Sequence, residues 1–478
     1  MTEAEFALAI LNNLPHTPTE GQRLLASGLA EFIFTKPENN QYLMFILRGY
    51  AGTGKTSMIS SLVKALPTLG KKTVLLAPTG RAAKVFSQYS GHPAFTIHRK
   101  IYMHQAQTDG MIRITLRKNL HKNTLFIVDE ASMIHNETSG NESEVFSRRN
   151  LLDDLITYVY SSNCRLLLTG DTAQLPPVGL EDSPALDTKY IKTAYPVSLF
   201  TSELTEVVRQ EKDSGILYNA TLLRQKLSTE NYSIPYFDLK QFDDVLRISS
   251  NELEDALNEN ISLKGIENTV VVTRTNKRAN LFNNEIRKRI LFRDHEVTAG
   301  DIMMAVKNNY FWLSPESQAG FIANGDIIEI LRVKKITELY GFRFADVQIR
   351  LTDYPNEPEL EVRILLNTLM SVSASLTKEE NIRLFEEVMK DYEAIPSRRE
   401  RLKQLRANPY FNALQVKFAY ALTCHKTQGG QWENIFIDQG YIPADSRNKE
   451  YLRWLYTSIT RGTRRIYMIG FDDELFKD

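Results

Sequence analysis

Cysteine is scarce in this chain, which has only two, Cys164 and Cys424, in 478 residues. Because they lie far apart in the sequence, they indicate neither a disulfide framework nor a zinc cluster, and their scarcity fits a reducing compartment. Apolar runs of membrane-spanning length are also missing, and the first residues lack the basic segment and apolar core of a secretory signal. These absences predict a cytoplasmic globular protein.

An excess of charge of either sign is missing as well. Lysine and arginine total 58, and aspartate and glutamate also total 58. Net charge therefore does not favour binding to nucleic acid, and any site for a polyanion has to be a local groove. The hydrophobic content of 42% and the charged content of 24% are ordinary for a globular protein, and the length allows two to four domains.

A phosphate-binding loop is the strongest motif in the chain. Residues 49–56 read GYAGTGKT and fit the pattern G-x-x-x-x-G-K-[ST], between an apolar run at 42–47 and a predicted helix at 57–66. Glycines let backbone N–H groups close around phosphate oxygens, and the helix N-terminus adds its positive dipole end. The residues expected to hold a nucleotide and its metal are Gly49, Gly52, Thr53, Gly54, Lys55 and Thr56. We expect Lys55 to reach the β- and γ-phosphates and Thr56 to ligate Mg²⁺.

An acidic pair follows a second apolar run. Residues 124–128 predict a buried strand, and Asp129 and Glu130 come directly after it. Asp129 is expected to hold Mg²⁺, and Glu130 to orient and polarise the attacking water. An acidic pair at a strand end is common on its own, so its meaning depends on the phosphate loop upstream. Together the two motifs predict a P-loop nucleoside triphosphatase.

The order of strands and helices predicts an α/β fold with two units. Strands alternate with helices over residues 42–179, which indicates a doubly wound parallel sheet with its site at the carboxyl ends of the strands. The α/β pattern begins again near residue 200, without a second phosphate loop. We therefore expect one domain at 1–200 and another at 201–478.

Two insertions are expected within these domains. Alternation around a glycine tip predicts a β-hairpin at about 99–121. Short strands over 300–365 predict a small barrel or sandwich, and two charged helices follow within 377–406. The α/β pattern is expected to return with a strand at 417–423, which places the insertion in the second domain at about 330–412.

Nine short motifs stand in an order that resembles superfamily 1 helicases of the RecD-like and Dda-like branch. The matching residues are Gln22, 49–56, 77–86, 96–98, 129–132, 170–179, 208–210, 425–430 and 456–461. The resemblance implies two RecA-like P-loop motor domains, with the hairpin inserted in the first and an SH3-like domain with a helical arm inserted in the second. It also implies a DNA helicase and single-stranded DNA translocase that uses ATP and Mg²⁺ and moves 5′→3′.

The resemblance also implies roles for single residues. Gln22 would read adenine, and Gln174 would couple the γ-phosphate to DNA. Arg209 and Arg461 would be arginine fingers from the second domain, since a guanidinium fork matches phosphate oxygens and stabilises transition-state charge. Without the motif, either arginine is more simply a surface ion pair. The residues expected to be catalytic are then Lys55, Glu130, Gln174, Arg209 and Arg461.

The DNA contacts that the resemblance implies lie on both domains. They fall on Pro78, Thr79, His98, Thr427 and Gln428. Hydroxyls, backbone N–H groups and a histidine suit a phosphodiester backbone and read no base sequence. The neighbouring Lys426 is either a backbone clamp or the partner of an acidic residue, and the sequence leaves both open.

The implied partners are single-stranded DNA and junctions of single- and double-stranded DNA. Single-strand-binding or recombination proteins are further candidate partners of a monomeric motor in DNA replication, repair or recombination. Two other functions stay open: a motor subunit of a recombination nuclease, and a non-unwinding DNA-binding clamp on a helicase fold. RNA also stays open as the track, because contacts to a backbone read little of the sugar.

Overall fold

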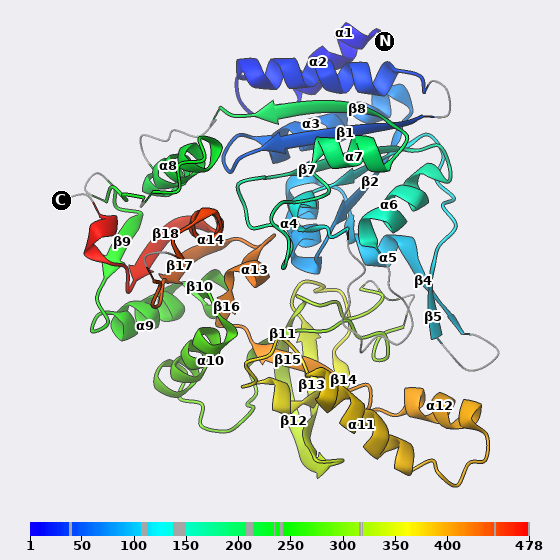
Figure 1. Cartoon of the computed structure of the whole chain (residues 1–478), viewed down its shortest axis with the longest axis vertical. Coiled ribbons are helices and arrows are strands. Elements are labelled where there is room, and N and C mark those ends of the chain that lie inside the picture. Colours follow the sequence, from blue (N-terminus) through cyan, green and yellow to red (C-terminus); the bar gives the residue numbers. More distant parts are fainter. Residues whose placement is uncertain are drawn as a thin grey trace.

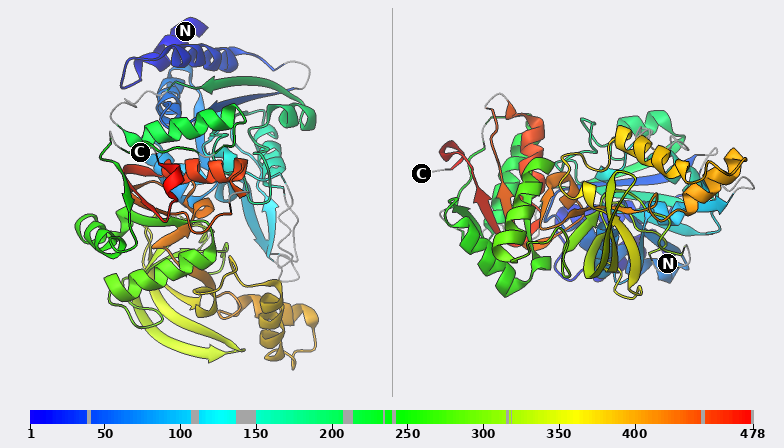
Figure 2. Two further views of the ribbon diagram at one scale, coloured as in Figure 1. Left: turned by 60° about the vertical axis from the view of Figure 1, so that its left-hand side comes forward. Right: turned by 90° about the horizontal axis from the view of Figure 1, so that it is seen from below.

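The computed structural model has two α/β units beside each other and a β-barrel beneath them (Figure 1). It describes residues 1–37, 41–106, 112–136, 150–206, 214–233, 235–239, 242–314, 317, 319–443 and 446–476. The N-terminal helices lie at the outer edge of the first unit, and the barrel carries a helical arm (Figure 2). Within the described residues, no helix is both long enough and apolar enough to cross a membrane.

The first unit is built on six parallel strands in the order β3-β2-β6-β7-β1-β8. The strands are β1 (Tyr42–Gly49), β2 (Lys72–Ala77), β3 (Ala94–Thr96), β6 (Thr124–Val128), β7 (Arg165–Gly170) and β8 (Val197–Leu204). The sheet therefore extends to Leu204, slightly past the expected boundary at residue 200. Because parallel strands end at one edge, the phosphate loop after β1, the acidic pair after β6 and the loop after β7 are brought together there.

Helices cover both faces of this sheet, as a doubly wound fold requires. One face is covered by α1 (Glu3–Asn12), α2 (Glu20–Phe34), α3 (Lys55–Ala65) and α4 (Gly80–Ser90), and the other by α5 (Ile97–Ile101), α6 (Leu151–Tyr160) and α7 (Thr188–Ala194). In β1, Phe45 and Leu47 join the first core, whereas Met44 and Ile46 join the second. Burial on both faces explains why this strand is apolar at nearly every position.

The structure has a hairpin within the expected range of 99–121, but the hairpin is shorter than that range. Strands β4 (Tyr102–Ala106) and β5 (Ile112–Leu116) pair antiparallel. Residues 97–101 instead form α5, because the side chain of Thr96 accepts a hydrogen bond from the Arg99 N–H at 3.2 Å and caps a helical turn. Of the expected polar tip at 105–110, residues 105 and 106 belong to β4, and residues 107–110 lie outside the described residues.

The second unit is a five-stranded parallel sheet in the order β16-β10-β17-β18-β9. Its strands are β9 (Val245–Ile248), β10 (Thr269–Thr273), β16 (Ala421–Thr423), β17 (Trp432–Asp438) and β18 (Gly462–Ile469). Its helices are α8 (Gly215–Ser228), α9 (Leu253–Lys264), α10 (Asn276–Glu285), α13 (Cys424–Thr427) and α14 (Lys449–Ile459). In β10, Val271 faces the core of α9 and α10, and Val270 and Val272 face the core of α8 and α14.

The strand-rich insertion is a closed five-stranded barrel, and its strands span a longer part of the sequence than the expected 330–412. It consists of β11 (Ile302–Ala305), β12 (Ile327–Leu339), β13 (Phe342–Leu351), β14 (Leu360–Leu365) and β15 (Leu414–Phe418). The expected single strand at 417–423 is wrong, because β15 pairs with β11 and β14 whereas β16 joins the second sheet. Tyr420 lies at this switch, where its hydroxyl accepts a hydrogen bond from the Ile302 N–H at 3.0 Å.

The two expected charged helices form an arm on the barrel. They are α11 (Lys378–Lys390) and α12 (Arg398–Ala407). Leu384, Val388 and Leu405 are their buried residues, and they pack on Phe342 and Phe344 of β13. The arm is therefore held by a narrow apolar seam, and it projects from the barrel (Figure 2).

Candidate nucleotide site and nucleic-acid face

The phosphate loop has the backbone that its glycines permit. Gly52 and Gly54 have φ angles of +78° and +83°, a left-handed conformation that residues with a Cβ rarely adopt. A Cβ on Gly49 would lie 3.1 Å from the Leu204 carbonyl oxygen and from the side chain of Lys55. The Lys55 ammonium donates hydrogen bonds to the carbonyls of Gly49 and Tyr50 at 2.6 and 2.8 Å, so it lies over the loop.

The acidic pair lies at the adjacent strand end. The Glu130 N–H donates to a carboxylate oxygen of Asp129 at 2.9 Å, and Glu130 itself has a φ of +52°. Burial, followed by the charge of Glu130, raises the pKa of Asp129 to about 7. Thr56 and Asp129 line the same cavity and offer hydroxyl and carboxylate oxygens, which are the donors that Mg²⁺ prefers. The residues therefore fit the expected metal.

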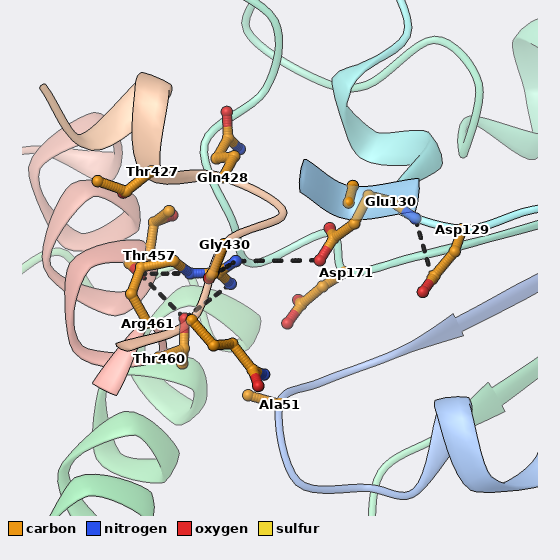
Figure 3. Close-up of polar contacts among 12 residues, drawn as sticks. Ala51, Asp129, Glu130, Asp171, Thr427, Gln428, Gly430, Thr457, Thr460 and Arg461 are labelled. Carbon is orange, nitrogen blue, oxygen red and sulfur yellow. Dashed lines mark hydrogen bonds and ion pairs between the residues drawn. The ribbon is translucent and has the colours of Figure 1, made fainter. Parts of the chain in front are cut away.

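This cavity, of about 290 Å³, lies between the two α/β units. From the first unit it is lined by Lys55, Thr56, Asp129, Glu130, Asp171 and Gln174, and from the second by Gly430, Thr460 and Arg461, among others. Figure 3 shows Glu130 and Asp171 of the first unit facing Arg461 of the second across the cleft. The site is therefore shared by both units.

Arg461 extends into this cleft from the end of α14. Its side chain is only 5% exposed, and its guanidinium lies 3.9 Å from Glu130 (Figure 3). The same group donates to the carbonyls of Thr457 and Gly430 at 3.2 and 3.4 Å, which fixes its direction. The structure thus places one expected arginine finger beside the acidic pair. The other, Arg209, lies outside the described residues.

Tyr456 connects the two units, a role that the sequence analysis missed. Its hydroxyl accepts a hydrogen bond from the Ala51 N–H of the phosphate loop at 2.9 Å and donates one to the Asp171 carboxylate at 2.7 Å. Burial, and then the charge of Asp171, raises the pKa of Tyr456 well above its ordinary value, so the hydroxyl keeps its proton. The available signal was its place in the motif at 456–461, five residues before Arg461.

The loop after β7 is held by the same helix and by the loop after β16. The Leu175 N–H donates to the hydroxyl of Thr457 at 2.9 Å, and the Leu175 carbonyl accepts from the amide of Gln428 at 2.7 Å. Gln174 lies between these contacts and is buried, and its side-chain oxygen has no hydrogen-bond partner among the described residues. Because Gln174 lines the cleft, its unpaired side-chain oxygen is available to form a hydrogen bond with a ligand that binds there.

The expected DNA residues of the second unit are buried in this structure. Thr427 is fully buried, and its hydroxyl donates to the Cys424 carbonyl at 2.7 Å. The Gln428 amide is engaged by Leu175, as described above. Burial lowers the pKa of Lys426 to about 8, and in the described part of the chain no carboxylate lies within 4 Å of its ammonium. Of the two roles left open for Lys426, pairing with an acidic residue therefore has no support.

The expected DNA residues of the first unit lie around the starts of α4 and α5. Pro78 and Thr79 follow β2, and the Thr79 hydroxyl accepts from the Ala82 N–H at 3.2 Å to cap α4. The barrel meets this helix start, because a Cβ on Gly80 would lie 2.2 Å from a carboxylate oxygen of Asp326. His98 lies on α5, where burial lowers its pKa to about 4 and leaves its ring neutral at physiological pH.

Gln22 is fully buried behind the phosphate loop. Its side-chain oxygen accepts from the Thr19 N–H at 3.2 Å, which completes a capping box at the start of α2. Its amide donates to the Thr53 carbonyl at 3.4 Å. The structure therefore brings Gln22 to the phosphate loop, with both ends of its amide engaged within the protein.

Each α/β unit contains residues that match a known family model. A family model described as an AAA domain matches residues 38–232, and one described as a UvrD-like helicase C-terminal domain matches residues 418–469. A protein of Acanthamoeba polyphaga mimivirus, itself uncharacterized, is 24% identical over 93% of this chain and 98% of its own length.

Two relatives carry helicase names. The ATP-dependent DNA helicase dda of Enterobacteria phage T4 is 27% identical over 60% of this chain and 60% of its own length. The ATP-dependent RecD2 DNA helicase of Deinococcus radiodurans is 30% identical over 37% of this chain and 21% of its own length. The match thus spans less than two thirds of either helicase. A crystal structure of Pif1 helicase from Bacteroides, in complex with ADP-AlF3 and ssDNA, covers 96% of this chain and 94% of its own at 14% identity, with a TM-score of 0.47.

Proposed function

Because the chain belongs to the superfamily 1 helicases of the Dda-like and RecD-like branch, we propose that it is an ATP-dependent DNA helicase and single-stranded DNA translocase. The observation that carries the proposal is the shared cleft, in which Arg461 of the second unit lies 3.9 Å from Glu130 of the first. A site that is complete only when both units meet can convert nucleotide turnover into relative motion of the units.

The residues of the first unit would bind the nucleotide. The phosphates would lie in the loop at 49–56, where Lys55 would exchange the carbonyls of Gly49 and Tyr50 for phosphate oxygens. Thr56 and Asp129 would hold Mg²⁺, which neutralises charge that develops on the phosphates. Glu130 would orient the attacking water, and Gln22 would support the loop from behind through Thr53.

The residues of the second unit would complete the site and transmit its state. Arg461 would stabilise the charge of the transition state, and we assign the same role to Arg209 on the resemblance alone. Tyr456 would respond to changes in the position of the phosphate loop, because its hydroxyl forms hydrogen bonds with both the Ala51 N–H and Asp171. Gln174 and Gln428 would carry the change toward the DNA through the contacts of Leu175.

DNA would lie across both units. We propose contacts at Pro78, Thr79 and His98 on the first unit, and at Thr427 and Lys426 on the second. An ammonium without a carboxylate nearby, in the described part of the chain, is suited to a phosphate. The hairpin of β4 and β5 would be the wedge at the duplex junction, and the barrel would be SH3-like. We also propose a monomeric 5′→3′ motor that acts in replication, repair or recombination.

The test is unwinding of two matched duplexes, one with a 5′ and one with a 3′ single-stranded tail. ATP and Mg²⁺ are supplied, and turnover is measured in parallel. Lys55→Ala should abolish both activities, whereas Lys64→Ala, an exposed lysine at the far end of the same helix, should leave them unchanged. Unwinding of the 5′-tailed duplex alone supports the motor and its direction.

The other outcomes separate the parts of the proposal. Preference for the 3′ tail refutes the direction but keeps the helicase. ATP turnover stimulated by single-stranded DNA without unwinding indicates a translocase or a motor subunit of a larger complex. If single-stranded DNA does not stimulate ATP turnover, the proposed helicase activity is refuted, and the non-unwinding DNA-binding clamp is the function that remains.

A further inference from the structure

The loop that follows α13 packs on a helix of the opposite unit. This loop, residues 428–431, belongs to the second unit, whereas α4 belongs to the first. A Cβ on Gly429 would lie 2.7 Å from the Cβ of Ala82. A Cβ on Gly430 would lie 2.6 Å from the Nε of Arg81. Two successive glycines therefore let the loop approach the first turn of α4 more closely than larger residues could.

Arg81 lies at the centre of this contact. Its guanidinium carbon is 3.7 Å from the centroid of the Trp432 ring, and its Nη2 donates a hydrogen bond to the Gln431 carbonyl at 3.3 Å. Tyr89, further along α4, donates its hydroxyl hydrogen to the side-chain oxygen of Gln431 at 3.3 Å. Burial lowers the pKa of Arg81, and the charge of Asp353 opposes this shift. The guanidinium is therefore partly withdrawn from water, which strengthens its attraction to the ring.

The same segment of the second unit holds the arginine finger. The Gly430 carbonyl accepts a hydrogen bond from the Arg461 guanidinium at 3.4 Å (Figure 3). The Trp432 N–H donates to the Arg461 carbonyl at 3.0 Å. Arg461 is thus fixed at both its side chain and its backbone by residues that pack on α4. Its guanidinium in turn lies 3.9 Å from Glu130.

The contact between loop and helix also forms part of the wall of the nucleotide cavity. Val85 and Tyr89 of α4 line this cavity together with Gln431 of the loop. The N-terminal cap of α4 is Thr79, one of the residues proposed to contact DNA. Helix α4 therefore extends from the proposed DNA face to the nucleotide cavity, and Arg81 lies in its first turn.

We propose that Arg81 positions the arginine finger, an inference that rests on the proposed function. Arg81 is a positioning residue and not a catalytic one, because it acts through other residues. It holds Trp432 and the loop, and these hold the Arg461 guanidinium toward Glu130. Hydrolysis then requires α4 of the first unit as well as the finger of the second, which makes turnover depend on how the two units meet.

The experiment measures ATP turnover by the full chain at saturating single-stranded DNA and determines kcat and KM separately. Arg81→Ala removes the guanidinium, whereas Arg81→Lys keeps a cation but loses the planar group that stacks on the ring. The matched control is Lys84→Ala. This lysine lies on the same helix, but its ammonium pairs with Asp353, in the turn between β13 and β14, at 3.3 Å. Thermal unfolding of each variant shows whether stability has changed.

Arg81→Ala should lower kcat by about 10–100-fold and leave the KM for ATP unchanged. A displaced finger stabilises the transition state less but does not weaken binding of the ground state. Arg81→Lys should lose less activity than Arg81→Ala, and Lys84→Ala should match the unaltered protein. Because Arg81 acts through the finger, Arg81→Ala should cause no further loss of kcat in a variant that already carries Arg461→Ala.

Three results would overturn the inference. An unchanged kcat in Arg81→Ala shows that the finger does not depend on α4. A raised KM with an unchanged kcat assigns Arg81 to nucleotide binding instead. Losses that multiply when Arg81→Ala and Arg461→Ala are combined show that the two arginines act independently. Failure of the proposed function is seen separately, as absence of DNA-stimulated ATP turnover in the unaltered chain.

Discussion

The hydroxyl of Tyr456 should couple the two units, and Tyr456→Phe tests this with the loss of one oxygen atom. That oxygen accepts from the Ala51 N–H at 2.9 Å and donates to Asp171 at 2.7 Å. Its removal leaves a backbone donor and a carboxylate oxygen without this partner at the cleft. Loss of such a contact to a charged group costs about 2 kcal/mol.

The cost falls on the closed arrangement, because opening of the cleft returns both groups to water. About 2 kcal/mol corresponds to a shift of roughly 30-fold in the equilibrium between closed and open units. We therefore expect ATP to close the cleft less completely in the variant, with weaker nucleotide binding and fewer base pairs unwound for each ATP. Energy transfer between one dye on each unit, measured against ATP concentration, reports the closure directly.

A matched control lies on the same helix. Tyr451 is buried, but its hydroxyl has no hydrogen-bond partner among the described residues. Tyr451→Phe removes the same atom from the same kind of environment and should leave closure unchanged. If Tyr456→Phe and Tyr451→Phe behave alike in closure and in unwinding for each ATP, the proposed link between loop and helix is refuted.

Three further predictions concern single residues. Arg461→Lys should lower ATP turnover by about 10³-fold while a fluorescent nucleotide still binds. Arg464→Lys, at a surface ion pair with Glu433, should leave ATP turnover unchanged. Equal effects of the two variants would contradict the role of Arg461 as an arginine finger. Gly54→Ala should weaken nucleotide binding, because an L residue at φ +83° is strained by about 1–2 kcal/mol. Gly70→Ala, at φ +62° in open space, should lower the stability of the protein but leave nucleotide binding unchanged. Lys426→Met should raise thermal stability at neutral pH and weaken DNA binding. Its buried ammonium has a pKa near 8 rather than 10.5, so the folded state binds fewer protons between these values and the gain should fade as pH rises from 8 to 10.5; a gain that is constant with pH would contradict this origin.

Local features of the structure were predictable from the sequence. The phosphate loop follows from its glycines, since their backbone angles are open to few other residues. The parallel order of strands and helices in both units, the hairpin and the two arm helices follow from apolar patterns and turn residues that act over a few positions. The chemistry of Asp129 and Glu130 could be proposed because a strand end and a phosphate loop define their surroundings.

Only the tertiary structure decided which distant residues meet. The bonds of Tyr456 to Ala51 and Asp171 join residues 405 and 285 positions apart. Such contacts depend on how two separately folded units are placed, and no local pattern encodes that placement. Tertiary structure also decided that β11 and β15 close the barrel, although both strands lie outside the expected insertion at 330–412. Which sheet a strand joins depends on the strands that the fold places beside it.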